Sequence, residues 1–138
     1  MTSTPYDGIA DWYDNIVRTS WGNHKDELPL LLELMGDVEN EDICDLGCGQ
    51  GAVTRRLAQA GARVVGVDIS ERLLEFAKQN EEAEPLGIRY VRDDAEDLNT
   101  LPDQSFDGVV STWSLIDIED LAACLNSVAR ILRPDGWL

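Results

Sequence analysis

Apolar and polar positions alternate with the period of a helix in the first part of the chain. Apolar residues recur at intervals of three and four residues between positions 6 and 36. They are Ile9, Trp12, Tyr13, Ile16, Val17, Leu28, Leu31, Leu32 and Met35. Pro29 is tolerated in a first helical turn, and Gly36 is a typical stop. We therefore predict a helical segment over residues 6–36 and a polar linker over residues 37–42.

After the linker, short apolar runs alternate with stretches of helical spacing. The β-branched and aromatic runs predict buried strands at 43–46, 63–67, 88–91 and 106–111. Helices are predicted over residues 50–60 and after Ser70, which is a good N-cap. A last helix should bury Leu121, Leu125, Val128 and Leu132 and end at Arg133-Pro134-Asp135-Gly136. Strands that alternate with helices indicate βαβ units, so we expect an open, mostly parallel α/β sheet.

The length and composition limit the class of protein. The 138 residues suffice for one domain, and 43% hydrophobic with 28% charged residues is typical of a soluble globular chain. No apolar run approaches the roughly 20 residues of a membrane-spanning helix. The N-terminus has neither a basic start nor an apolar stretch, so no secretory signal is evident. We expect a cytoplasmic protein.

The charge and the cysteines argue against several functions. The net charge is −16, which repels phosphate backbones and anionic membrane surfaces. We therefore expect neither nucleic acid nor membrane as a partner. The three cysteines form no Cys-x-x-Cys pair and the chain has one histidine, so neither a disulfide framework nor a metal site is expected.

The strongest chemical signal is the glycine loop, residues 47–51, which reads Gly47-Cys48-Gly49-Gln50-Gly51. It lies between a predicted strand and a predicted helix, where backbone N–H groups face a ligand. Glycine is needed where the backbone adopts a positive φ or approaches a ligand closely. A structural turn is the alternative interpretation of this loop.

The spacing of the glycines separates two kinds of cofactor. Dinucleotide-binding proteins use Gly-x-Gly-x-x-Gly, whereas here the glycines alternate and Asp45 precedes them. A carboxylate at that place repels a pyrophosphate but suits a cation such as the sulfonium and ammonium of S-adenosylmethionine. Asp68, at the end of the second strand, suits ribose hydroxyls in either case. A nicotinamide-dependent oxidoreductase therefore remains an alternative.

Acidic residues also follow the third predicted strand. Asp94 can accept a hydrogen bond from an adenine amino group while the Ala95 N–H meets a ring nitrogen. Carboxyl ends of parallel strands are where ligands bind. Taken alone, this stretch fits a solvated acidic turn at least as well.

Five motifs together resemble the class I S-adenosylmethionine-dependent methyltransferases that act on small molecules, of the type 11 kind. The motifs are Asp45–Gly51, Val64–Ser70, Asp94–Leu98, Ser105–Val110 and Leu132–Gly136. The match runs in order from about Tyr6 to the end of the sequence. It implies a Rossmann-like core over residues 43–138 and a helical lid over residues 1–36, in a single domain.

The resemblance also implies roles for individual residues. The methionine part of S-adenosylmethionine would contact Asp45, Gly47, Cys48, Gly49 and Gly51, with Ser111 and Trp113 lining the same end. Asp68 would bind the ribose, and Ile69, Asp94 and Ala95 would frame the adenine. Tyr13 would lie near the sulfonium, although core packing explains its place in a helix equally well.

The sequence departs from the family in two respects. Many relatives carry histidine at the position of Ile116 or Asp117, so a histidine base is excluded there and no catalytic residue is predicted. The family sheet has the strand order 3-2-1-4-5-7-6, and this sequence ends where the fifth strand is expected to begin. We therefore expect the order 3-2-1-4, with the later strands missing and the methyl acceptor not identifiable.

These patterns lead to one function with alternatives. The chain is predicted to bind S-adenosylmethionine and to transfer its methyl group to a small molecule. The alternatives are a non-catalytic cofactor-binding fragment and the oxidoreductase. Because the fourth strand is apolar and carries no lysine or proline, we also expect its free edge to pair with a second copy in a homodimer.

Overall fold

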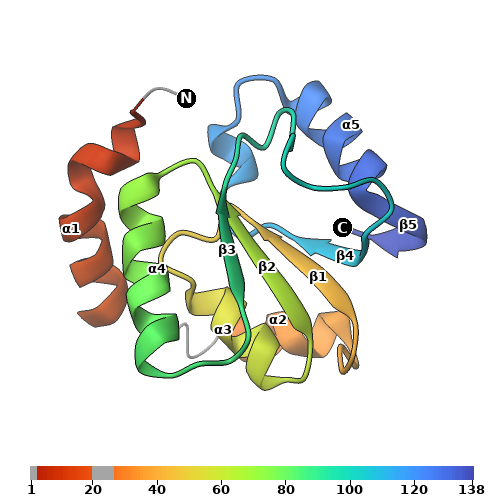
Figure 1. Cartoon of the computed structure of the whole chain (residues 1–138), viewed down its shortest axis with the longest axis horizontal. Coiled ribbons are helices and arrows are strands. Elements are labelled where there is room, and N and C mark those ends of the chain that lie inside the picture. The colour runs from red at the N-terminus through yellow and green to blue at the C-terminus, as the bar shows by residue number, and fades with distance from the viewer. Residues whose placement is uncertain (1–2, 20–26) are drawn as a thin grey trace.

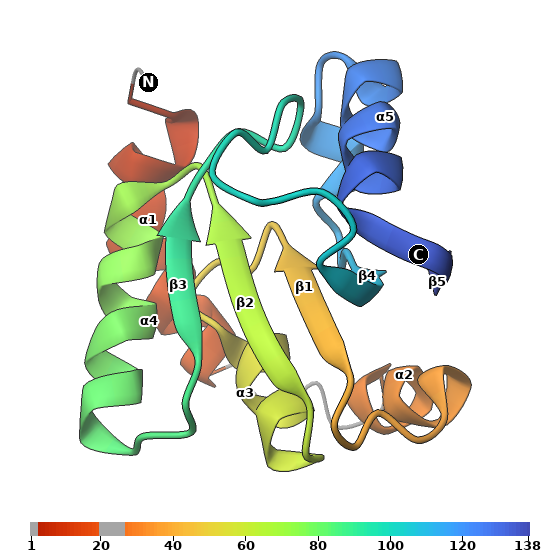
Figure 2. The same ribbon diagram turned by 45° about the vertical axis from the view of Figure 1, so that its right-hand side comes forward.

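Five parallel strands form the centre of the molecule. The computed structural model describes residues 3–19 and 27–138. The strands are β1 Asp42–Leu46, β2 Arg63–Asp68, β3 Arg89–Arg92, β4 Phe106–Val110 and β5 Leu132–Trp137. Their order across the sheet is β3-β2-β1-β4-β5, and every neighbouring pair is parallel (Figures 1 and 2). The α/β class with a mostly parallel sheet is confirmed.

The helices begin and end close to the predicted places. They are α1 Pro5–Thr19, α2 Glu27–Met35, α3 Ala52–Gln59, α4 Glu71–Ala83, the short 3-10 helix η1 Leu115–Asp117, and α5 Leu121–Ile131. Ser70 caps α4 as predicted, because its hydroxyl accepts a hydrogen bond from the Leu73 N–H at 3.2 Å. The predicted segment 6–36 is represented by α1 and α2, and its residues 20–26 lie outside the described part.

Helices cover both faces of the sheet. On one face, α2 and α3 pack on Ile43, Val64 and Val110. On the other face, α5 and the segment between β3 and β4 pack on Cys44, Leu46, Val67 and Val109. Helix α4 packs against β2 and β3, and α1 lies against α4 rather than against the sheet (Figure 2). None of the described helices is long and apolar enough to cross a bilayer.

The expectation that no fifth strand forms is wrong. Residues predicted to end the last helix belong to β5, which pairs with β4 through Phe106↔Leu132 and Gly108↔Trp137. The register shifts between these two pairs, and such a bulge accommodates Pro134 and Gly136 inside a strand. Gly108 makes room for Trp137, since a Cβ there would lie 2.3 Å from the indole ring.

The presence of β5 removes the basis of the predicted homodimer. That prediction required a free edge on β4, and β5 occupies that edge. The apolar character of β4 is explained by its position inside the sheet, where strands are buried on both faces.

The apolar faces of two helices are also shifted from the prediction. On α5 the buried residues are Cys124, Ser127, Val128 and Ile131, whereas Leu121 and Leu125 are exposed. On α1, Ile9 and Trp12 are exposed, and the buried residues are Ala10, Asp14 and Val17. Apolar spacing defines a stripe but not its centre, and contact with α4 and the sheet places that centre one residue away.

Candidate functional site

The carboxyl ends of four strands meet at one side of the sheet, which we call the carboxyl edge. The glycine loop follows β1, Asp68 ends β2 and Ile69 comes directly after it, and separate turns follow β3 and β4. Eleven of the twelve predicted site residues belong to these segments or immediately precede the loop, and Tyr13 comes from α1. The structure therefore brings together residues that the sequence separates by up to about 100 positions.

Different surroundings explain why glycine occupies each of the three glycine positions of the loop. All have positive φ, of 75° at Gly47, 55° at Gly49 and 89° at Gly51. A Cβ at Gly47 would lie 2.3 Å from the Cβ of Ser114, and one at Gly51 would lie 2.3 Å from the Tyr90 hydroxyl. A Cβ at Gly49 would meet nothing within 4 Å. Packing therefore explains Gly47 and Gly51, and Gly49 is the glycine that faces open space.

Asp68 is held beside that open space by backbone groups. Its carboxylate accepts hydrogen bonds from the Gly49 N–H and the Ser70 N–H, both at 2.8 Å. Burial raises the pKa of Asp68 above its ordinary value, and the two N–H groups partly oppose this rise. A carboxylate fixed in this way has lone pairs left for ligand hydroxyl groups, as the ribose prediction requires.

Asp45 has a more enclosed position than its neighbour. Its side chain is buried in β1 and accepts a hydrogen bond from the Thr54 hydroxyl on α3 at 2.7 Å. Burial raises its pKa to about 6, although the Thr54 hydrogen bond acts in the opposite direction. Asp45 therefore contributes negative charge beneath the loop, and its direct contact with a cofactor stays a prediction.

Cys48 presents only its backbone to the carboxyl edge. The thiol is buried in a cluster with Leu74, Ala77 and Tyr90, and burial raises its pKa well above the ordinary value. The Cys48 N–H donates to the Val67 carbonyl at 2.9 Å, as does the Gly47 N–H at 2.8 Å. These bonds fasten the start of the loop to β2.

The turn after β3 is stabilised by its own carboxylates. Asp93 is buried and accepts hydrogen bonds from the Thr100 N–H, at 2.8 Å, and from the Thr100 hydroxyl. Asp94 accepts from the Glu96 N–H at 3.0 Å and is only partly buried, as is Ala95. Asp94 therefore shapes the turn, and its contact with adenine stays a prediction.

The segment after β4 packs directly on the glycine loop. Ser114 donates a hydrogen bond to the Leu46 carbonyl at 2.9 Å and is bonded to the Ser111 hydroxyl. Between them, Trp113 has a φ of 61° and its side chain is 67% exposed. An aromatic residue in this conformation is an outlier of the kind found at functional sites. Trp113 is therefore available to a ligand at this edge.

Helix α1 brings two tyrosines to the same place. Tyr13 is partly buried, and its ring lies edge-to-face against the ring of Tyr6 with centroids 5.9 Å apart. Burial raises the pKa of Tyr13, and so do the charges of Asp68 and Asp117. Tyr13 therefore lies in the field of both carboxylates, and its position beside a sulfonium stays a prediction.

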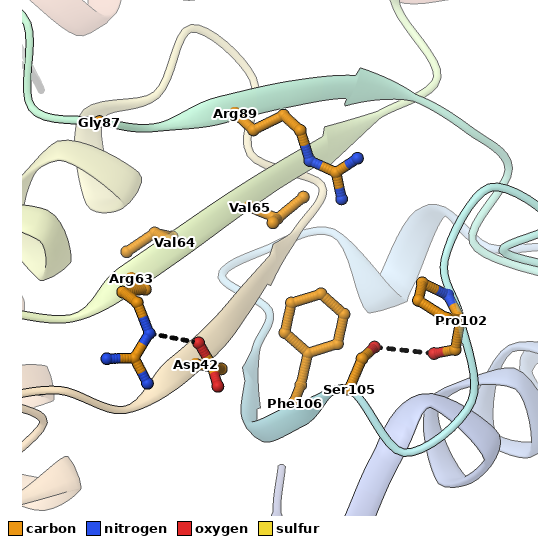
Figure 3. Close-up of a pocket in the computed structure, with 9 residues that line it drawn as sticks. All are labelled: Asp42, Arg63, Val64, Val65, Gly87, Arg89, Pro102, Ser105 and Phe106. Carbon is orange, nitrogen blue, oxygen red and sulfur yellow. Dashed lines mark hydrogen bonds and ion pairs between the residues drawn. The ribbon is translucent and has the colours of Figure 1, made fainter.

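The opposite side of the sheet, where the strands begin, has a different character, and we call it the amino edge. A cavity of about 320 Å³ opens there, with Val65 and Phe106 as apolar walls and Arg63, Arg89 and Asp42 around them (Figure 3). None of the predicted site residues lines it. Arg63 is paired with Asp42 at 2.6 Å, so these two side chains neutralise each other.

Comparison with known proteins identifies methyltransferases. A family model described as "Methyltransferase domain" matches residues 44–138. Demethylmenaquinone methyltransferase of Tropheryma whipplei is 33% identical over 107 residues, which are 77% of this chain and 43% of that protein. Ubiquinone biosynthesis O-methyltransferase of Coxiella burnetii is 35% identical over 101 residues, or 73% and 43% of the two proteins.

Solved structures give the same fold. An S-adenosylmethionine-dependent methyltransferase from Mesorhizobium loti superimposes with a TM-score of 0.71 at 36% identity, over 79% of this chain and 50% of the other. A putative methyltransferase from Methanococcus maripaludis gives a TM-score of 0.86 over 99% and 64% of the two chains, at 24% identity. The chain spans less than half the length of the curated relatives it matches.

Sequence reasoning missed three residues of this edge. Tyr6 donates a hydrogen bond to Asp117 at 2.7 Å across 111 positions of the sequence, and Ser114 packs on Gly47. No spacing rule connects residues so far apart. The glycine at position 47 indicated that some group packs closely against the loop, but the sequence did not show that this group is Ser114.

Proposed function

Because the chain belongs to the class I S-adenosylmethionine-dependent methyltransferase family, we propose that it binds this cofactor at the carboxyl edge and contributes to methyl transfer. The acceptor is a small molecule. The observation that carries the proposal is the pairing of Gly49, which faces open space, with Asp68, whose carboxylate is fixed beside it. No such pairing exists at the described amino edge, where carboxylates are bonded to arginines.

The residues present fit the cofactor. Asp68 would hold the ribose hydroxyls, and Asp94 with Ile69 would frame the adenine. Asp45, Asp68 and the tyrosine rings create a negative and aromatic environment that suits a sulfonium. The glycine loop would approach the methionine part through Gly49, with Ser111 and Trp113 on the β4 side.

The bound cofactor supplies an activated methyl group, and the chain supplies alignment. Methyl transfer from a sulfonium needs the acceptor atom in line with the breaking bond, and exclusion of water, more than it needs a base. Tyr13 and the carboxyl edge would orient the sulfonium. Asp117, on the segment after β4, accepts a hydrogen bond from Tyr6 at 2.7 Å.

The acceptor class is a finer question. Two relatives are named for demethylmenaquinone and for ubiquinone biosynthesis. We propose quinol-type acceptors as the first to be tested, because these relatives are 33% and 35% identical to this chain over the 107 and 101 residues that align. A non-catalytic cofactor-binding unit is the alternative, since the chain spans less than half of those proteins. The relatives and the family give no support to an oxidoreductase.

The cysteines bear on the compartment. Cys44, Cys48 and Cys124 are buried and unbonded to one another, as is usual in a reducing compartment. We therefore propose a cytoplasmic location.

The decisive experiment is calorimetry with S-adenosylhomocysteine and, in parallel, with NADH. Saturable binding of S-adenosylhomocysteine without binding of NADH is expected. Binding of NADH with no response to S-adenosylhomocysteine would overturn the proposal. Turnover with a demethylquinol acceptor then distinguishes a catalytic domain from a cofactor-binding unit.

A further inference from the structure

The first turn of α1 is bonded to both sides of the glycine loop. Asp7 accepts a hydrogen bond at 2.7 Å from the hydroxyl of Ser70, which follows β2. Tyr6 donates a hydrogen bond at 2.7 Å to Asp117, on η1 after β4. Because β1 lies between β2 and β4, these bonds straddle the end of β1, from which the glycine loop runs. Neighbouring strands are about 4.8 Å apart, so the first turn of α1, which we call the strap, crosses about 10 Å of the carboxyl edge.

We propose that Tyr6 and Asp117 are positioning residues that form a clasp, which holds α1 closed over the glycine loop and places Tyr13 beside the cofactor. The inference rests on the proposed function, because it concerns how the cofactor is held. Tyr6 acts through Tyr13, whose ring it contacts edge-to-face. Neither Tyr6 nor Asp117 needs to touch the cofactor.

The rest of α1 is attached loosely enough to move. Only Ala10, Asp14 and Val17 are buried on this helix, and Ile9 and Trp12 are exposed. A cavity of about 190 Å³ is lined by Asp14 and Val17 of α1 together with Gln50 of the glycine loop. Elements with few buried apolar contacts open at low free-energy cost. Asp11 of α1 also pairs with Arg72 of α4 at 3.0 Å, but both side chains are exposed, and such pairs contribute about 0–1 kcal/mol. The bonds of the first turn, to Ser70 and to Asp117, therefore have a large share in the closure of α1.

Tyr6 keeps the proton that it donates in the clasp at neutral pH. The hydrogen bond to Asp117, together with burial, raises the pKa of Tyr6 to about 12. The phenol consequently stays protonated, and can donate, at neutral pH. Asp7, which makes the other bond of this turn, to Ser70, is fixed independently of the clasp, because it also accepts from the Thr4 N–H at 3.0 Å. Loss of the clasp therefore frees one side of the strap while the Ser70 side remains bonded.

This arrangement predicts a specific kinetic signature. A strap across the loop obstructs a molecule that enters as well as one that leaves. Removing the clasp should raise both the association and the dissociation rate constants of S-adenosylhomocysteine, by about threefold to tenfold, the range given by loss of one hydrogen bond. The dissociation constant should change less than either rate. Loss of a direct contact would instead raise the dissociation rate alone.

Four variants of the whole chain test the clasp by surface plasmon resonance with S-adenosylhomocysteine. Tyr6→Phe and Asp117→Ala remove the hydrogen bond. Asp117→Asn removes the charge but keeps an oxygen that accepts from Tyr6, so it should restore slow exchange. Glu119→Ala is the matched control, because it removes an exposed acidic side chain two residues away. Thermal unfolding without ligand shows whether each variant is folded.

Faster exchange in both directions for Tyr6→Phe and Asp117→Ala, with Asp117→Asn and Glu119→Ala near the unmodified chain, supports the clasp. Unchanged rates, a rise in dissociation alone, or equal effects of Asp117→Asn and Asp117→Ala overturn it. Absence of binding by the unmodified chain is a different result, which overturns the proposed function itself.

Discussion

Carboxylates at the two edges of the sheet have different hydrogen-bond partners. At the amino edge, Asp42 is bonded to Arg63 and Arg133, and Asp107 to Arg133. At the carboxyl edge, Asp45 and Asp68 are bonded to a hydroxyl and to backbone N–H groups. An ion pair neutralises the charge of its carboxylate, so little negative charge remains to attract a cationic ligand. Carboxylates held by neutral donors keep their charge, which is what a cationic cofactor requires.

The pKa values follow the same division. The Arg63 guanidinium, with Arg133, lowers the pKa of Asp42, and the Asp42 N–H with Arg133 lowers that of Asp107. Burial raises the pKa values of Asp45 and Asp68. The amino edge therefore stabilises its ionised groups, and the carboxyl edge maintains charge at a cost to stability. Perturbed groups of this kind mark functional sites.

The largest effect on stability is expected from replacing glycines of the glycine loop by alanine. Gly47→Ala combines a positive φ with a Cβ 2.3 Å from Ser114, and should lower the free energy of unfolding by about 2–5 kcal/mol. Gly49→Ala has the same strain but open space, and should cost only about 1–2 kcal/mol. Urea unfolding measures both.

The same pair of variants separates packing from binding. If the cofactor occupies the space beside Gly49, Gly49→Ala should weaken binding of S-adenosylhomocysteine more than its effect on stability suggests. Retention of full affinity by folded Gly49→Ala would show that the open space is not part of the site.

Removing Asp68 should have the next largest effect. Asp68→Ala leaves the Gly49 and Ser70 N–H groups and the ribose without a charged partner, which costs about 1.5–3 kcal/mol, or roughly 10- to 150-fold in affinity. Asp103→Ala is the control, because Asp103 is exposed and paired with Arg130 at 2.7 Å. Calorimetry should find it nearly unchanged; equal losses would make Asp68 an ordinary surface acid.

The pH dependence of stability should carry opposite contributions from the two edges. The folded pKa of Asp45 is raised to about 6 from 3.8, so its contribution is full below about pH 4 and is lost as the pH rises through 6. The lowered pKa values of Asp42 and Asp107 give a contribution that is present above 3.8 and is lost as the pH falls.

Asp45→Asn isolates the first of these contributions. It keeps an acceptor for Thr54 but cannot ionise, so the decline in unfolding free energy between pH 4 and 7 should diminish by on the order of 2 kcal/mol. Thermal unfolding over this range measures it. An unchanged slope would mean that Asp45 ionises without penalty.

The smallest effect is expected at the amino edge. Arg63→Ala breaks the pair with Asp42, but the Arg63 side chain is 61% exposed, and such pairs contribute about 0–1 kcal/mol. Binding of S-adenosylhomocysteine should not change. A measurable loss of affinity would show that the two edges are coupled.

Local sequence patterns predicted the elements whose determinants are local. Four strands, the Ser70 cap and the glycine loop depend on neighbouring residues, and each was found where expected. Strand β5 was missed because Pro134 and Gly136 normally interrupt strands, and only pairing with β4 through a bulge permits them.

Features that depend on distant contacts could not be predicted. The buried face of α5 is set by the sheet, and the reason for Gly47 is Ser114, which lies 67 positions away. The bond between Tyr6 and Asp117 has no signal in the sequence. The positions of the predicted site residues were thus more predictable than the contacts that hold them in place, and their contact with a cofactor stays a prediction.

We infer that the cofactor binds at the carboxyl edge, and not at the amino edge with its cavity of about 320 Å³. Amide NMR of the labelled chain with S-adenosylhomocysteine tests it most directly. We expect shifts at the amides of Gly49, Asp68, Ser70 and Ala95, with those of Arg63, Arg89 and Ser105 unchanged. Shifts centred on Arg63, Arg89 and Ser105, with Gly49 and Ser70 unaffected, would contradict it.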